Sequence, residues 1–78
     1  MERKIEVKIM GQEYRLITDR PEEEAREIAS RVDGLLRNIK EKDPYISDTR
    51  AAVLLSLNLA EGIFRLEKKI KKLRELLP

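Results

Sequence analysis

The sequence predicts an α+β protein and an obligate oligomer, with an N-terminal β-hairpin and two helices. The second helix is predicted to be long and to extend into a C-terminal coiled coil. Apolar residues alternate with charged ones near the N-terminus, as in half-buried strands, and then recur every three or four residues, as in amphipathic helices. The chain has 78 residues and contains no Cys and no His. Without disulfides or ordinary zinc sites, a domain this small is expected to be stabilised by partner copies.

Residues 4–18 are predicted to form the β-hairpin. Two runs of alternating residues flank Gly11, and Gly readily adopts the positive φ angles of hairpin turns. The apolar members of the two runs are Ile5, Val7, Ile9, Tyr14 and Leu16. Because an isolated two-stranded hairpin is marginally stable in water, its apolar face must pack on another element.

The first helix is predicted over about residues 20–41. Asp19 is expected to cap its N-terminus, with Pro21 in the first turn and Glu22 three residues after Asp19. The apolar positions form one stripe along the helix: Ala25, Ile28, Ala29, Val32, Leu35, Leu36 and Ile39. Asp43 precedes a proline and therefore avoids the helical conformation, which predicts the end of the helix.

The second helix is predicted to begin after Ser47, which is a good N-cap residue, and to continue to Leu77. No Pro interrupts this stretch, and Gly62 is its only Gly. A helix of about 30 residues is roughly 45 Å long, which is more than a domain of this size can bury. The helix is therefore expected to project from the domain.

The two halves of this helix differ in their apolar pattern. The first half is apolar almost all round and needs cover on several sides, for which a second copy of the chain is the natural candidate. In the second half the apolar residues narrow to a heptad seam, which consists of Leu59, Ile63, Leu66, Ile70, Leu73 and Leu77. Ile at a positions with Leu at d positions favours a parallel two-stranded coiled coil over an amphipathic helix that packs on its own domain. The sequence thus predicts a head over residues 1–58 and an oligomerising stalk over residues 59–78.

Residues beside the seam favour more than a simple dimer. Lys69 and Arg74 would face each other and repel in a parallel pair, whereas an antiparallel arrangement lets Glu67 pair with Arg74 of another chain. Phe64 and Leu76 widen the apolar stripe beyond a dimer seam. We therefore expect parallel dimers that join through their stalks as tetramers.

The composition argues against an enzyme and predicts no cofactor or metal. The chain offers no imidazole base and no thiol, and its three glycines are too scattered to cradle a phosphate. No apolar run reaches the roughly 18 residues that span a bilayer, so stable membrane insertion is not expected. The first residues also lack the apolar stretch of a secretory signal, which favours a cytoplasmic location.

Basic residues near the C-terminus leave one alternative function open. A small basic coiled-coil module can bind nucleic acid or an anionic membrane surface. The formal net charge is only +2, and no aromatic side chain interrupts the basic residues to stack on bases. These features favour a solvated helix face and no nucleic-acid partner.

Several motifs, in order along the chain, resemble the ZapA family of bacterial cell-division proteins. They are residues 9–14 (IMGQEY), 28–33 (IASRVD), 43–47 (DPYIS), 50–54 (RAAVL) and 57–61 (LNLAE). The resemblance implies a head with a coiled-coil stalk that forms dimers and dimers of dimers. It also implies a protein without enzymatic activity that binds the tubulin-like GTPase FtsZ and bundles or cross-links its protofilaments at the mid-cell Z-ring.

Cross-linking of filaments requires at least two binding surfaces on one rigid body, which two heads would supply. The candidate contact residues for FtsZ are polar and lie on the predicted head, away from the stalk. They are Gln12, Glu13 and Arg15 at the hairpin turn, and Asp48 and Arg50 at the start of the second helix. Each contact can be weak, because tethered binding sites raise the effective concentration along a filament.

Overall fold

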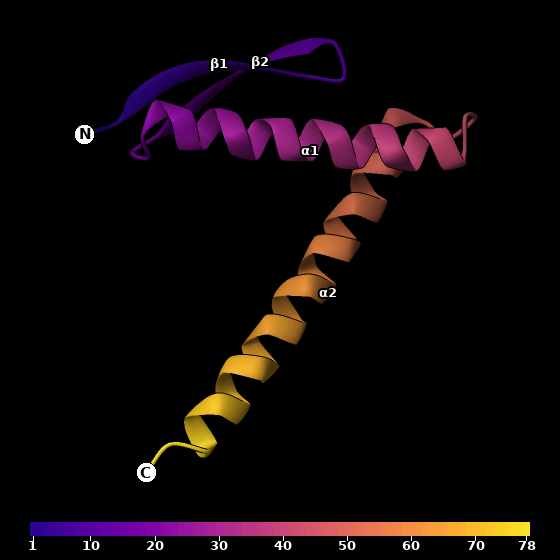
Figure 1. Ribbon diagram of the computed structural model, residues 1–78. Coiled ribbons are helices and arrows are strands. Elements are labelled where there is room, and N and C mark those ends of the chain that lie inside the picture. Colours follow the sequence, from indigo (N-terminus) through magenta and orange to yellow (C-terminus); the bar gives the residue numbers. More distant parts are fainter. The chain divides into compact units, whose positions relative to one another are not determined.

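The structure is a computed structural model that describes residues 1–78. Its elements are β1 (Arg3–Ile9), β2 (Gln12–Thr18), α1 (Glu22–Lys42) and α2 (Asp48–Glu75), as shown in Figure 1. This order confirms the predicted α+β class with a hairpin followed by two helices. The chain divides into two compact units, Met1–Ile46 with the hairpin and α1, and Ser47–Pro78 with α2. The predicted division into a head (residues 1–58) and an oligomerising stalk (residues 59–78) depends on how copies of the chain associate, so it stays a prediction.

β1 and β2 pair antiparallel, with a register that runs from Arg3 opposite Thr18 to Ile9 opposite Gln12. The two-residue turn between them has positive φ angles at both positions, 53° at Met10 and 79° at Gly11. A type I′ hairpin turn requires this combination, so the predicted role of Gly11 is confirmed. The positive φ at Met10 is unexpected, since side chains other than those of Asn, Asp and His are rare in this conformation.

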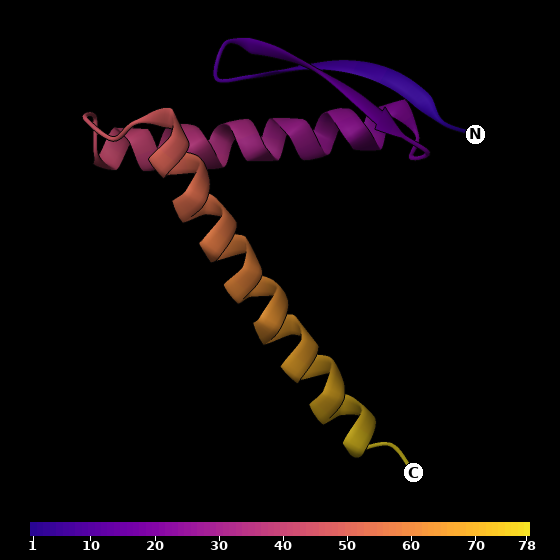
Figure 2. The same cartoon turned by 180° about the vertical axis from the view of Figure 1, so that it is seen from behind.

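The core of the first unit lies between the hairpin and α1, which run side by side (Figures 1 and 2). Its members are Ile5, Val7, Ala25 and Ala29, each at most 5% exposed. Ile9 is partly buried and packs against this cluster. Because α1 contributes only alanines to the cluster, the hairpin backbone can approach the helix closely.

The start of α1 shows that one prediction was wrong. Asp19 does not cap the helix, because the N-cap residue is Pro21 and no side chain provides a cap hydrogen bond. The Arg20 N–H instead donates to Thr18 Oγ1 at 3.1 Å, and the Pro21 carbonyl accepts the first helical bond from Ala25 at 3.1 Å. The reason is that Arg20 precedes a proline and so avoids the helical conformation, which starts the helix too late for Asp19 to cap it.

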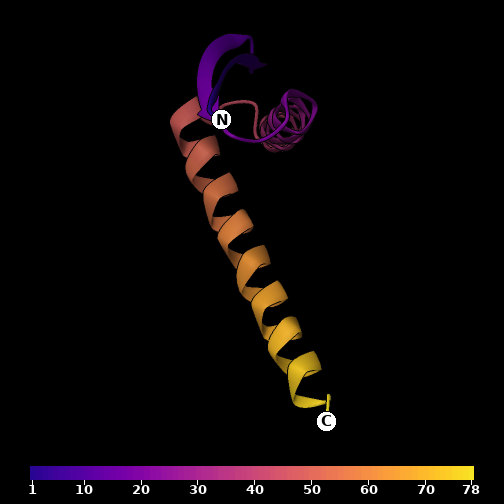
Figure 3. The ribbon, with the colours of Figure 1, turned by 90° about the vertical axis from the view of Figure 1, so that its left-hand side faces the viewer.

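The start of α2 confirms the predicted cap. Ser47 Oγ accepts a hydrogen bond from the Arg50 N–H at 3.1 Å, and Asp48 lies in the first turn. The helix contains 28 residues and runs without interruption through Gly62 (Figure 3). It ends at Glu75, so Leu77 lies just beyond the last helical residue. Neither helix is both long enough and apolar enough to span a membrane.

Candidate interaction surfaces

α2 carries a continuous row of exposed apolar side chains along its second half. In the single chain these side chains are between 45% and 71% exposed. They are the six residues of the predicted seam, of which Leu77 lies just beyond the end of α2 and the other five lie on it, namely Leu59, Ile63, Leu66, Ile70 and Leu73. Spacings of three and four residues place the five helical members on one side of the helix. The row is therefore a ready interface for another helix with the same spacing.

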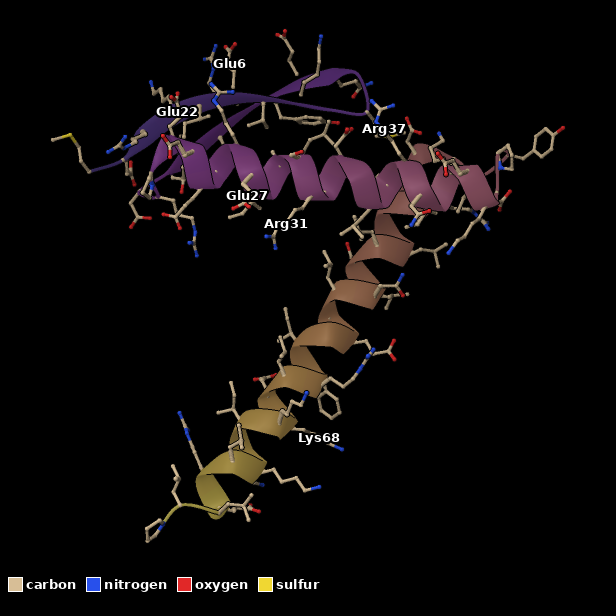
Figure 4. All side chains as sticks on the ribbon, viewed as in Figure 1. Glu6, Glu22, Glu27, Arg31, Arg37 and Lys68 are labelled. Atoms are coloured by element: carbon tan, nitrogen blue, oxygen red, sulfur yellow. The ribbon has the colours of Figure 1, made fainter.

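The apolar surface of α2 is wider than this row. Val53, Leu54 and Leu57 are exposed in the first half, Phe64 in the second half, and Leu76 at the C-cap. Figure 4 shows side chains projecting to both sides of the helix in this view. Monomeric soluble proteins rarely expose an apolar surface this extended, so α2 is a surface for association.

Charged side chains on α2 pair within the helix. Lys68 Nζ lies 5.0 Å from the centroid of the Phe64 ring, which is a cation–π distance. Arg65 forms an ion pair with Glu61, one turn earlier, at 3.5 Å. Part of the basic and aromatic surface near the C-terminus is therefore engaged in local contacts.

The strand register places the predicted hairpin contact residues on two different faces. Cross-strand partners share a face, so Gln12 lies on the core-facing side with Ile9, whereas Arg15 lies opposite Glu6 on the outer side. Glu13 is on the outer side as well. Figure 4 shows Glu6 on the side of the hairpin away from α1.

The polar contacts of these residues are weak and solvent-exposed. Arg15 and Glu6 form an ion pair at 3.4 Å, with side chains 69% and 63% exposed. Gln12 Oε1 accepts a hydrogen bond from the Tyr14 hydroxyl at 3.0 Å. Exposed ion pairs of this kind contribute little to stability, so these groups can exchange partners easily.

Asp48 and Arg50 lie in the first turn of α2, and both are exposed. They belong to the second compact unit, whereas the three hairpin residues belong to the first. The structure thus places Glu13 and Arg15 on the outer face of the hairpin, Gln12 on its core-facing side, and Asp48 and Arg50 in one turn of α2. That all five form one surface stays a prediction.

Asp33 on α1 holds the hairpin turn and was not identified from the sequence. Its Oδ1 accepts a hydrogen bond from the Met10 N–H at 2.7 Å, and its Oδ2 accepts one from Arg37 Nε at 2.9 Å. The Met10 hydrogen bond, followed by the contact with Arg37, lowers the pKa of Asp33 below its usual 3.8. An acidic residue one turn after core Ala29 was the only sequence signal for this contact.

The first unit also has an apolar surface that its own residues do not cover. Tyr14 and Leu16 lie opposite Val7 and Ile5, and so on the core-facing side of the hairpin, yet both remain exposed. Ile28 on α1 is exposed too.

No group of three or more His, Cys, Asp or Glu side chains is placed to hold a metal ion.

Comparisons with known proteins agree on one family. The sequence model described as "Cell division protein ZapA" matches residues 5–78. The cell division protein ZapA of Bacillus licheniformis is 32% identical over 71 residues, covering 91% of this chain and 84% of the relative. The protein of the same name from Bacillus pumilus is 36% identical over 70 residues, covering 90% of this chain and 82% of the relative.

A solved structure has the same fold. It is described as a ZapA mutant dimer from Geobacillus stearothermophilus and matches with a TM-score of 0.79 at 27% sequence identity. The match covers 96% of this chain and 87% of that chain. Family model, curated relatives and fold all extend over nearly the whole length of the molecule, and this chain therefore belongs to the ZapA family of cell-division proteins.

Proposed function

We propose that this protein is a non-enzymatic regulator of cell division that binds FtsZ and bundles or cross-links its protofilaments. It acts in the cytoplasm at the mid-cell Z-ring. The observation that carries the proposal is the exposed apolar row on α2 in a chain of the ZapA family. A protein with one filament-binding head and one self-association helix becomes a cross-linker as soon as its copies pair.

Self-association occurs through the six predicted seam residues, five on α2 and Leu77 just after it. The spacing of these residues and their exposure support a coiled coil, and the solved relative is described as a dimer. Two dimers then join through their stalks to form a tetramer. The exposed Tyr14, Leu16 and Ile28 in the first unit offer further apolar area that a second copy can cover.

Filament contact is made by Gln12, Glu13 and Arg15 of the hairpin together with Asp48 and Arg50 of α2. All five residues are exposed, and the Arg15–Glu6 ion pair is a weak one, which suits a surface that must bind and release. Each contact is individually weak. Several heads on one assembly bind a periodic filament tightly because the later contacts are intramolecular.

Co-sedimentation with FtsZ filaments tests this proposal. We expect the wild-type protein to pellet with filaments and to bundle them in electron micrographs. Arg15→Glu combined with Arg50→Glu is expected to abolish pelleting while the oligomer mass stays unchanged. The matched control reverses the charge at Arg31 and Arg65. These two are exposed arginines as well, and each forms an ion pair with a glutamate one turn earlier.

The outcomes separate the parts of the proposal. Failure of the wild-type protein to pellet would show that FtsZ is not the partner. Normal pelleting of the Arg15 and Arg50 double variant, with the oligomer intact, would show that the contact surface lies elsewhere. Binding to DNA or anionic vesicles that falls steeply between 50 and 200 mM salt, as counterion release requires, would instead support the basic coiled-coil alternative.

A further inference from the structure

We infer that Asp33 is a positioning residue that fixes the tip of the hairpin, and with it Gln12 and Glu13, from its place on α1. The inference rests on the proposed function, because these two residues belong to the proposed filament-contact surface. Asp33 itself is not assigned a contact with the filament.

The carboxylate of Asp33 links two elements that are distant in the sequence. Its two oxygens bind different donors, the Met10 N–H at 2.7 Å and Arg37 Nε at 2.9 Å. Met10 and Asp33 are 23 residues apart, so the bond forms only in the folded unit. The Asp33 side chain is 25% exposed, and charge-assisted hydrogen bonds of this length are the strong ones.

The bond acts where the hairpin is strained. Met10 has a φ of 53°, a conformation that residues with an ordinary side chain adopt only when their surroundings hold them there. The ladder pairs residues up to Ile9 and from Gln12 onward. The Met10 N–H lies outside this ladder, and Asp33 provides its acceptor.

The rest of the hairpin is held by other contacts, which end before the tip. Ile5 and Val7 are buried against α1, while Ile9 is only partly buried. Arg26 Nη1 donates to the Glu6 carbonyl at 3.0 Å and anchors the middle of β1. Loss of Asp33 should therefore release the tip and leave the base of the hairpin in place.

Amide hydrogen exchange on the full-length protein tests the link directly. We expect Asp33→Ala to speed exchange of the Met10 amide by about tenfold or more, as for loss of a hydrogen bond to a charged group. Exchange at Val7 should stay within about twofold of the wild type. Asp33→Asn keeps an oxygen acceptor and should restore part of the protection. Asp19→Ala, an exposed aspartate at the other end of the hairpin, is the matched control and should change neither amide.

A rescue experiment distinguishes positioning from direct contact. Asp33→Ala is expected to weaken filament binding at unchanged oligomer mass. Adding Met10→Asn should recover most of the binding, because Asn-Gly strongly favours a type I′ turn without an external acceptor. If Asp33 touched the filament itself, a change at Met10 could not replace it.

The results that overturn the inference differ from those that overturn the proposed function. Unchanged Met10 exchange in Asp33→Ala would show that the link does not form. Faster exchange with undiminished filament binding, or lost binding that Met10→Asn does not restore, would show that Asp33 does not position the contact surface. Absence of wild-type binding would refute the proposed function and the binding role of Asp33, while the exchange measurement would still decide whether the link exists.

Discussion

Asp33 places one negative charge where a backbone N–H and an arginine side chain converge on its two oxygens. The pKa of this carboxyl is lowered mainly by the Met10 N–H. Its ionised form is therefore more stable in the folded state than in the unfolded state. The stability of the hairpin–α1 unit must then depend on pH in the acidic range.

The sign of this dependence follows from linkage. The stabilisation is fully present above the usual Asp33 pKa of 3.8 and is lost as pH falls through the lower pKa of the folded state. We expect the urea midpoint of the wild type to exceed that of Asp33→Asn by a constant margin from about pH 5 to 7 and to converge on it below about pH 4. Both proteins are compared at one protomer concentration, since association shifts apparent stability. A margin that stays constant down to the acid limit would contradict the prediction.

At the scale of elements, the close packing of the hairpin on α1 depends on small side chains. Ala25 and Ala29 are almost fully buried beneath Ile5 and Val7. Larger residues at these helix positions would push the sheet away from the helix. This dependence explains why two alanines serve as the helix side of the core.

Ala29→Leu is expected to lower the free energy of unfolding by about 1–3 kcal/mol, because the added atoms overpack the interface between hairpin and helix. Urea denaturation followed by circular dichroism measures the change. Ser30→Leu, on the exposed neighbouring position of α1, is the control and should have little effect. Equal effects of the two substitutions would show that the hairpin does not approach α1 as closely as described.

The start of α2 depends on one hydroxyl group. Ser47→Ala removes the acceptor of the Arg50 N–H and should destabilise the protein by about 1 kcal/mol. Ser56→Ala is the same chemical change in mid-helix, where the hydroxyl only donates back to the Ala52 carbonyl at 2.8 Å. That variant should be neutral or slightly stabilising, since Ala is the better helix former. Thermal unfolding of both variants gives the comparison, and a larger loss from Ser56→Ala would contradict the assigned cap.

At the scale of the whole molecule, the exposed apolar row on α2 predicts that the single chain of 9.2 kDa is not the working species. A small domain with so much apolar surface gains stability mainly by pairing. Sedimentation across a range of concentrations should give masses of two or four chains. A stable monomer at micromolar concentration would refute self-association.

Ile63→Lys combined with Ile70→Lys should separate binding from bundling. Buried lysines in the seam destabilise a coiled coil, so we expect a lower mass, filament pelleting through single heads, and no bundles in electron micrographs. The control combines Glu61→Lys with Glu75→Lys. Both positions are seven residues from Lys68, and all three lie on the face away from the seam. This control adds more positive charge than the test variant, and should still bundle filaments. Bundling by the Ile63 and Ile70 variant would show that the seam does not join the heads.

The sequence by itself determined the elements, the cap at Ser47 and the apolar row of α2. Each of these depends on residues within a few positions of one another, whose spacing is visible in the chain. The cap predicted at Asp19 failed for a local reason as well, because the effect of Pro21 on Arg20 outweighed the capping motif.

Only the tertiary structure decided which faces and which distant residues come together. The strand register separated Gln12 from Arg15, since a shift of one residue reverses the face on which a strand side chain lies. The bond from Met10 to Asp33 spans 23 residues, and periodicity carries no information about such a pair. It forms because packing of Ile5 and Val7 on α1 brings a strained turn within reach of a carboxylate.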